Sequence, residues 1–247
     1  MSRKTKEAVQ GAIYILPSFV LILIFCIIPI FMSGYFSFTE YNIMNSPKFV
    51  GLDNYIKMFK DSYVTDAAKN TLLYVVMTVP AQTILALAFA AFLAAKIQNK
   101  KGEFLRSVMF IPVIASAVTA GTVWRIILNT DGGFLNNILN FFHISSVNWL
   151  GSTKTSLLSI CIVAVWKNVG YFLVIYYAGI MGIQKDLYEA ARVDGANGWQ
   201  QFWKITLKLL TPTIHFNLVM QMINGFLAFT QCLIITQGKP MNSTLFY

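Results

Sequence analysis

The sequence predicts an all-α protein: a polytopic bundle of transmembrane helices that forms one domain over residues 1–247. Of the 247 residues, 56% are hydrophobic and only 12% are charged, whereas roughly a quarter of the residues of a soluble domain carry charge. Five apolar stretches are each long enough to cross a hydrocarbon core about 30 Å thick. The loops between them alternate between basic and charge-balanced composition, as the positive-inside rule requires of successive membrane sides.

The first predicted span, residues 11–38, follows the basic segment RKTK. It is far longer than the core of a signal peptide and lacks an obvious cleavage site, so we expect a retained span with a cytoplasmic N-terminus. Pro17 and Pro29 are expected to kink this helix or to end it locally. The charge-balanced loop that follows contains Leu52–Phe59, a predicted short amphipathic helix on the outer membrane surface.

Four further spans are predicted at residues 70–95, 107–128, 155–182 and 209–236. The loop after the second span carries four basic residues against one glutamate, and the loop at 183–208 is basic as well. Both loops are therefore expected in the cytoplasm. Five spans leave the C-terminus outside, within what reads as a loop, and we expect a sixth span after Tyr247.

One cytoplasmic segment, DLYEAARVDGANG from Asp186 onward, has the features of a short exposed helix. Asp186 precedes Glu189 by the spacing of a capping box, so the helix should begin near Leu187. Gly195 suits the left-handed conformation that closes a helix. Small side chains leave the helix backbone approachable for another protein, at Ala190, Ala191 and Ala196. Three larger side chains are available as anchors, Leu187, Tyr188 and Val193.

Polar or small side chains recur on one face of the last predicted span, at spacings of four, three, four and three: Asn217, Gln221, Asn224, Ala228 and Gln231. Unpaired carboxamides cost several kcal/mol in hydrocarbon, so this stripe must face protein or water. Two interpretations stay open. The carboxamides join helices to one another, or they form one wall of a solute pathway.

The fourth predicted span contains a second polar group, Lys167, Asn168 and Tyr171. An ammonium near the bilayer centre costs roughly 2.5–3.5 kcal/mol and normally faces a cavity or a partner. The alternative is that the span begins later along the chain and that Lys167 snorkels outward. Tyr171 is a residue type that more often packs than stacks on a ligand.

No sequence feature indicates catalysis or a bound cofactor. The chain has no P-loop, HExxH or nucleophile-elbow pattern. The spans contain no Asp or Glu, which disfavours a proton-coupled carrier. The three cysteines lack metal spacing. The net charge of +9 is clustered beside the spans, which favours contact with membrane lipid over nucleic acid.

The segment 186–212 resembles the cytoplasmic signature loop of the integral-membrane permeases of binding-protein-dependent ABC importers. That pattern is EAA, three residues, Gly, nine residues and Ile-x-Leu-Pro. The chain matches it at Glu189-Ala190-Ala191, Gly195, Ile205 and Leu207, while Lys208 replaces the proline. The stretches FVGLDNYIKMF, FIPVIASAVTAGTVWRIIL and WKNVGYFLVIYYAGIMGIQKDLY are similar to the sugar-permease, maltose-type branch of that family.

This resemblance implies a permease subunit, without enzymatic activity, of an ATP-driven importer of a sugar or oligosaccharide in the inner membrane of a bacterium or archaeon. The implied partners are a second homologous permease, two cytoplasmic ATPases and an external solute-binding protein. ATP and Mg²⁺ would bind in the ATPases, and this chain would hold no cofactor or metal. A six-helix core in the family agrees with the expected sixth span.

The resemblance also implies roles for single residues. The ATPase-coupling element would comprise Asp186, Glu189, Ala190, Ala191, Asp194 and Gly195. The candidate pathway residues are Lys167, Asn168, Tyr171, Asn217, Gln221, Asn224 and Gln231. A polyol, a glycerol phosphodiester or an anionic sugar is the alternative solute, and a single-component carrier or a membrane-embedded enzyme is the alternative function.

Overall fold

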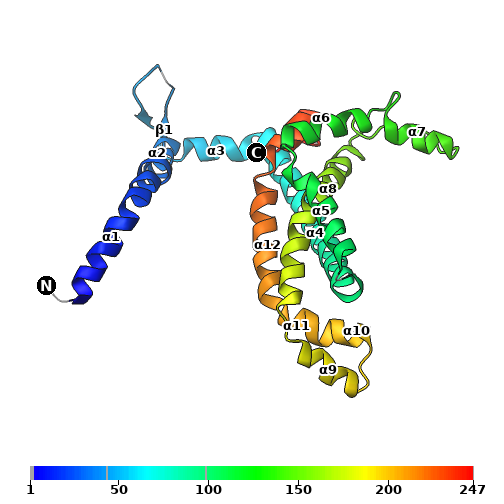
Figure 1. Cartoon of the computed structure of the whole chain (residues 1–247). Coiled ribbons are helices and arrows are strands. Elements are labelled where there is room, and N and C mark those ends of the chain that lie inside the picture. Colours follow the sequence, from blue (N-terminus) through cyan, green and yellow to red (C-terminus); the bar gives the residue numbers. More distant parts are fainter. Residues whose placement is uncertain (1–2, 43, 98, 247) are drawn as a thin grey trace. The chain divides into compact units, whose positions relative to one another are not determined.

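The computed structural model describes residues 3–42, 44–97 and 99–246 (Figure 1). Within these ranges the chain is predominantly helical, and its one sheet is a two-stranded hairpin. Three helices in this part of the chain are long and apolar enough to cross a membrane, or up to five if each of two bent helix pairs counts as one span. The predicted all-α membrane fold is thereby confirmed. The expected sixth span would follow Tyr247 and lies outside the described residues.

The chain divides into two compact units, Met1–Ser62 and Tyr63–Tyr247. The first contains α1 (Arg3–Ile22), the π-helical turn η1 (Leu23–Ile27) and α2 (Ile28–Ser37). Neither proline ends this helix, since Pro17 lies inside α1 and Pro29 lies in the first turn of α2, directly after the π-helical turn. A proline leaves the carbonyl four residues earlier without its partner, and the wider turn accommodates that loss.

A short hairpin and helix complete the first unit: β1 (Thr39–Glu40), β2 (Lys48–Phe49) and α3 (Asp53–Lys60). The strands pair antiparallel. The Asn54 side chain donates hydrogen bonds to the carbonyls of Ser37 and Thr39, at 3.0 and 2.9 Å, and so fixes α3 against the end of α2. Helix α3 lies one residue later than the amphipathic helix predicted from the sequence.

The second unit contains four long helices and several short ones. The long helices are α4 (Ser62–Lys96), α5 (Lys100–Ile114), α8 (Ser156–Met181) and α12 (Thr211–Phe226). At one end lie α9 (Lys185–Val193), α10 (Gly198–Gln201), the π-helical turn η2 (Phe202–Thr206) and α11 (Leu207–Leu209) (Figure 1). At the other end lie α6 (Ala117–Ile127), α7 (Phe134–Phe141) and α13 (Phe229–Thr236). From the loop charges we expect the α9 end on the cytoplasmic side.

Two of the predicted spans are broken helices. The third falls on α5 and α6, which meet at an angle of 96°, and the last falls on α12 and α13, which meet at 47°. Ala115 is extended at the first break, and the Ser116 hydroxyl caps α6 by accepting from the amide of Val118 at 3.3 Å. The hydropathy pattern predicts neither break, because both halves of each span are apolar.

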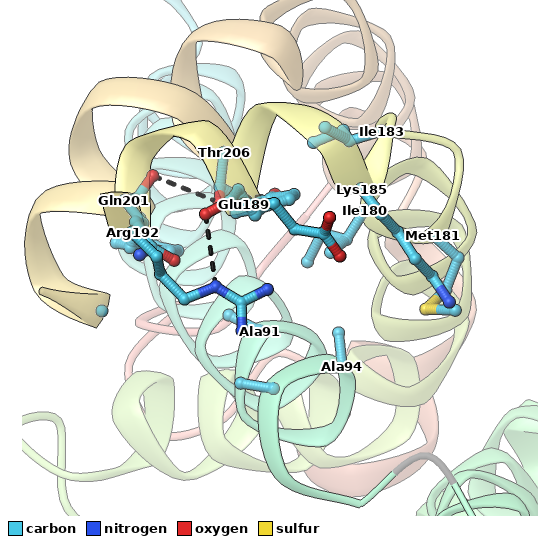
Figure 2. A pocket seen from close by; sticks show the side chains of 14 residues that line it. Ala91, Ala94, Ile180, Met181, Ile183, Lys185, Glu189, Arg192, Gln201 and Thr206 are labelled. Atoms are coloured by element: carbon cyan, nitrogen blue, oxygen red, sulfur yellow. Dashed lines mark hydrogen bonds between the residues drawn. The ribbon is translucent and has the colours of Figure 1, made fainter. Parts of the chain in front are cut away.

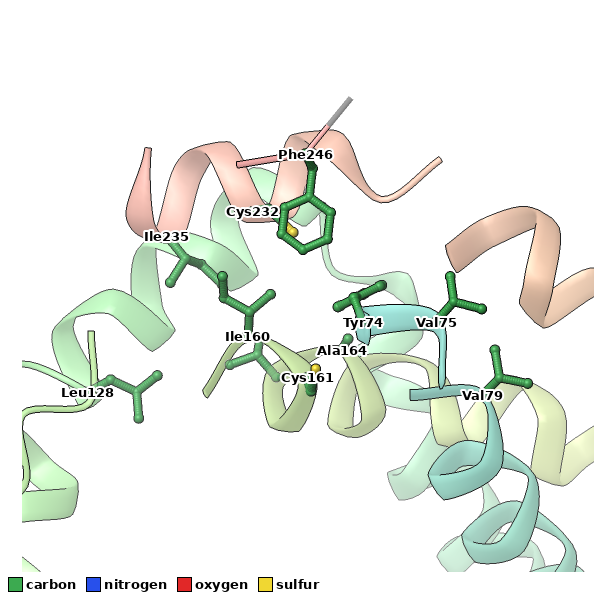
Figure 3. Packing of buried hydrophobic residues seen from close by; sticks show 11 residues of the cluster. Tyr74, Val75, Val79, Leu128, Ile160, Cys161, Ala164, Cys232, Ile235 and Phe246 are labelled. Atoms are coloured by element: carbon green, nitrogen blue, oxygen red, sulfur yellow. The ribbon is translucent and has the colours of Figure 1, made fainter. Parts of the chain in front are cut away.

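Two apolar clusters hold the long helices together. The outer cluster joins α4, α8 and α13 and includes Tyr74, Val75, Ile160, Cys232, Ile235 and Phe246 (Figure 3). The inner cluster lies toward α9 and joins α4, α8 and the turn before α12; it includes Ala86, Ala90, Leu93, Phe172, Leu173, Tyr176 and Leu210. Along α4 and α12 the structure also has polar side chains, here called the polar layer: Thr78, Gln82, Thr83, Asn217 and Gln221.

The segment after α13 closes the outer cluster, which the sequence does not predict. The ring of Phe246 packs edge-on against Tyr74, with centroids 5.3 Å apart. The Asn70 side chain donates to the carbonyls of Asn242 and Leu245, at 2.6 and 3.2 Å. What reads as a loop is therefore anchored to the start of α4.

Candidate functional site

Helix α9 is the core of the predicted coupling element. Its start differs from the sequence prediction, and its end agrees with it. The helix begins at Lys185 with Gln184 in the N-cap position, so the prediction that Asp186 caps it was wrong. A capping box does occur, one helix later, where the side chain of Asn197 and that of Gln200 each accept from the other residue's amide at 2.9 Å.

The end of α9 is closed by Gly195, as predicted. Gly195 has φ +80°, and the amide of Ala196 donates to the carbonyl of Ala191 at 2.8 Å. The Gly195 amide donates to Arg192 at 3.1 Å, which completes a Schellman motif, with Asp194 as the C-cap residue. The chain therefore leaves α9 in a fixed direction.

Helix α9 presents two different faces. Val193 and Leu187 are 89% and 43% exposed, and Asp186 and Ala190 are exposed beside them. The opposite face carries four side chains that line an open cavity of about 470 Å³ beneath the helix: Lys185, Tyr188, Glu189 and Arg192 (Figure 2). Of these four, Tyr188 is half-buried and the three charged side chains are exposed. Positions i, i+3, i+4 and i+7 share one face of a helix, so the predicted coupling residues are divided between a surface and a cavity.

Tyr188 is not one of the exposed anchors. Its hydroxyl shares a hydrogen bond of 2.9 Å with the hydroxyl of Thr206, which is buried at the end of η2. This bond ties α9 to the segment that leads into α12. Lys208, which replaces the family proline, is exposed in α11, and Pro212 lies in the first turn of α12.

The predicted stripe on the last span is divided by the break between α12 and α13. Asn217 and Gln221 are 0% and 2% exposed and lie in the polar layer, where Thr83 donates to the Gln221 carbonyl oxygen at 3.2 Å. Asn224, one turn on, is exposed. Gln231 is buried in α13, beyond the bend. The regular spacing in sequence therefore does not give one continuous face in space.

The polar layer contains buried hydrogen-bonding groups without a partner. Among the described residues, four buried atoms in this layer and beside it have no hydrogen-bond partner: both amide atoms of Asn217, the amide nitrogen of Gln221 and the Tyr176 hydroxyl. The Tyr176 hydroxyl lies within interaction range of Asn217, Thr83 and Gln221. Buried polar groups are normally satisfied by protein, water or a ligand. The four atoms can be satisfied by water, by a ligand or, since the Tyr176 hydroxyl lies close to Asn217 and Gln221, by one another after a small side-chain rotation.

Lys167 neither faces that layer nor snorkels outward. Its ammonium donates to the carbonyls of Ala115, Val113 and Pro112, at 2.9, 3.3 and 3.5 Å. These carbonyls are the unsatisfied acceptors at the C-terminal end of α5, where the helix dipole favours a cation. Lys167 and Tyr176 are nine residues apart in α8, so they lie on roughly opposite faces of the helix. Asn168 is half-buried and Tyr171 exposed, so the structure does not bring this group together with Asn217.

A polar site that the sequence reasoning missed lies in the outer loop. The Asn136 side chain is 1% exposed; its oxygen accepts from the Trp149 indole at 2.9 Å and from the Val147 amide at 3.0 Å. Its nitrogen donates to the carbonyls of Thr130 and Val147. Trp149 also packs against the outer cluster. The high asparagine content of the loop was the one sequence feature that could have indicated this hydrogen-bonded site.

Among the described residues, no group of three or more His, Cys, Asp or Glu side chains is placed to hold a metal ion. Cys161 and Cys232 are buried free thiols, and Cys26 is an exposed one.

Comparison with known proteins gives a consistent family. Residues 59–247 match the family described as "Binding-protein-dependent transport system inner membrane component". The chain is 37% identical to the probable ABC transporter permease protein YesP of Bacillus subtilis, over 98% of this chain and 79% of that protein. It is 31% identical to the trehalose/maltose transport system permease protein MalF of Thermococcus litoralis, over 98% and 81% of the two chains.

A solved structure shares the fold. A chain of a bacterial alginate ABC transporter, crystallised in complex with an alginate pentasaccharide-bound periplasmic protein, superposes with a TM-score of 0.82. The match covers 98% of this chain and 81% of that one, at 24% sequence identity.

Proposed function

Because this chain belongs to the family of binding-protein-dependent transport system inner membrane components, we propose that it forms half of the translocation pathway of an ATP-driven importer for a sugar or oligosaccharide. It is a multi-pass membrane protein whose relatives are transport permeases, components without enzymatic activity. The carbohydrate class is supported by relatives named for the transport of trehalose/maltose, lactose and starch degradation products.

We propose that the complete importer pairs this chain with a second homologous permease, two cytoplasmic ATPases and an external solute-binding protein, in the inner membrane of a bacterium or archaeon. The family description supports the binding protein and the inner membrane, and the name ABC transporter of the relatives supports the ATPases. ATP and Mg²⁺ would act in the ATPases. Energy from their closure would reach this chain through the element formed by Asp186, Glu189, Ala190, Ala191, Asp194 and Gly195.

The observation that carries the coupling role is the outward face of α9. Leu187 and Val193 are exposed apolar side chains on a helix at the basic end of the bundle, and the small Ala190 lies between them in the sequence. An exposed apolar face with small residues indicates a surface that another protein covers. Through the Tyr188–Thr206 bond, movement of that face reaches the segment before α12.

The solute pathway rests on the unpaired groups of the polar layer. Asn217 and Gln221 offer donors and acceptors that suit sugar hydroxyls, whereas Lys167 is held by three carbonyls and gives no specific support for an anionic sugar. A polyol or a glycerol phosphodiester would use the same carboxamides. Mass spectrometry of the ligand that co-purifies with the solute-binding protein distinguishes these solutes. Roles for Asn168, Tyr171, Asn224 and Gln231 stay predictions.

Co-purification and transport in reconstituted vesicles test the proposal. Val193→Asp should release the ATPases and stop ATP-dependent uptake, while Met241→Asp, a change at an equally exposed residue after α13, should leave the ATPases bound. Uptake without ATP would show a single-component carrier instead, and retention of the ATPases by V193D would contradict the assignment of the docking face.

A further inference from the structure

The cavity beneath α9 has the size and construction of a ligand site. Its volume of about 470 Å³ falls within the roughly 300–1,000 Å³ typical of small-molecule sites. Helix α4 contributes three alanines to its wall, α8 contributes its last turn, and η2 contributes Phe202 and Thr206. The alanines leave the space that larger side chains would fill: Ala91, Ala94 and Ala95.

The charged groups of the cavity have a definite order. Figure 2 shows the Glu189 carboxylate pointing into the space between α9 and α4, with Arg192 to one side and Lys185 to the other. The Nε of Arg192 donates to the Tyr188 carbonyl at 3.3 Å, which orients the guanidinium. The cavity thus offers two cations and one carboxylate above an apolar wall.

The position of the cavity identifies the kind of molecule that reaches it. It lies where α4 ends at Lys96 and α8 ends at Met181, the level at which membrane-spanning helices emerge among lipid headgroups. The apolar side chain of Met181 lines the cavity and is 43% exposed. A molecule with a charged head and an apolar tail fits both parts of the wall.

We propose that this cavity binds the headgroup of an inner-leaflet phospholipid that carries a phosphate and a primary ammonium group, as phosphatidylethanolamine does. The phosphate would accept from Arg192 and Lys185, since a guanidinium is suited to phosphate oxygens. The ammonium would donate to Glu189, and the acyl chain would leave along the alanines of α4. The bound lipid would join α9 to the ends of α4 and α8. The proposal rests on the cytoplasmic side that the proposed function gives to α9.

Native mass spectrometry of the purified importer complex, released from nanodiscs of defined lipid composition, measures the binding. Retention of phosphatidylethanolamine should exceed that of phosphatidylcholine, whose trimethylated nitrogen has no N–H to donate, and that of phosphatidylglycerol, which has no ammonium. Lys185→Gln and Arg192→Gln should each weaken retention about tenfold, as loss of one charge-assisted hydrogen bond does. Lys204→Gln removes an exposed charge of η2 that does not line the cavity and should retain the lipid.

A fourth variant protects the test against misfolding of α9. Ala91→Leu fills the cavity from α4 without changing a charge, and it should lower lipid retention while the ATPases remain bound. Equal retention of the three lipids, or unchanged retention in A91L, would overturn the proposal. Displacement by soluble phosphoethanolamine at millimolar concentration would show a free metabolite in place of a lipid. Loss of ATPase binding with lipid retention intact would count against the proposed function alone.

Discussion

Gly170 of α8 lies against the carbonyl oxygen of Met109 in α5, so closely that a Cβ atom at position 170 would overlap that oxygen. The two helices approach each other closely at this residue. The contact sets the position of α5, and therefore of the break at its end.

Gly170→Ala is expected to destabilise the protein by about 1–3 kcal/mol, because overpacking forces backbone shifts. Gly34→Ala is the matched control, since Gly34 is also helical and has no atom within 4 Å of the position of an added Cβ. That change should be neutral or slightly stabilising, because alanine favours a helix by about 1 kcal/mol. Thermal unfolding of the purified protein measures both; equal unfolding temperatures would contradict the packing assignment.

Lys167→Met should destabilise the break between α5 and α6. It removes a cation that satisfies three carbonyls, and a hydrogen bond to a charged group contributes roughly 1.5–3 kcal/mol. Lys167→Arg should retain part of the stability, since the guanidinium is also a cationic donor. Lys154→Met, at an exposed loop residue, serves as the control in the same unfolding experiment. A fully stable K167M protein would show that water can replace the ammonium.

Asn217→Leu separates the two interpretations of the stripe. Both Asn217 amide atoms lack partners in the described structure, so the change to leucine removes no hydrogen bond. Leucine is larger than asparagine and position 217 is fully buried, so we expect an overpacking cost of about 1–3 kcal/mol. If Asn217 contacts the solute, uptake by reconstituted vesicles should fall about tenfold or more while the complex stays assembled. Unimpaired uptake would assign Asn217 to helix packing alone. Gln221→Leu should differ, because it leaves the Thr83 hydroxyl without its acceptor.

Gly195→Ala should loosen the end of α9. A residue with a Cβ loses about 1–2 kcal/mol in the left-handed conformation that Gly195 adopts. The expected result is ATP hydrolysis with reduced uptake, because the docking face is no longer held in a fixed orientation. Gly198→Ala, where an added Cβ meets no atom within 4 Å and no left-handed conformation is required, should keep the two activities coupled. The ratio of ATP hydrolysed to solute taken up is the measurement.

Sequence reasoning succeeded where a property depends on neighbouring residues. Apolar stretches predicted the membrane helices, and the steric freedom of Gly195 predicted the end of α9. It failed where distant residues decide. The break after Ile114 is stabilised by Lys167, which is 52 residues away from Ala115 in the chain. The break after Phe226 changes the helix phase, so Gln231 in α13 no longer continues the face that carries Asn217 and Gln221 in α12.

The coupling loop shows the same division. The capping-box pattern at Asp186 and Glu189 is correct in spacing, but the helix starts one residue before Asp186 and places Glu189 in the cavity. Tertiary contacts such as the Tyr188–Thr206 hydrogen bond, and not the local sequence, determine which face is turned outward. A spacing rule alone does not contain that information.

The hydrogen bonds from Lys167 to three carbonyls also make the break between α5 and α6 and the lysine depend on each other during evolution. In a relative with a continuous helix here, the three carbonyls would accept helical hydrogen bonds. A lysine at this position would then lack acceptors within the membrane and would destabilise the protein. A relative that keeps the break without the lysine must supply another donor. Selection should therefore change the two features together, and an alignment of the family should show their substitution as a correlated pair.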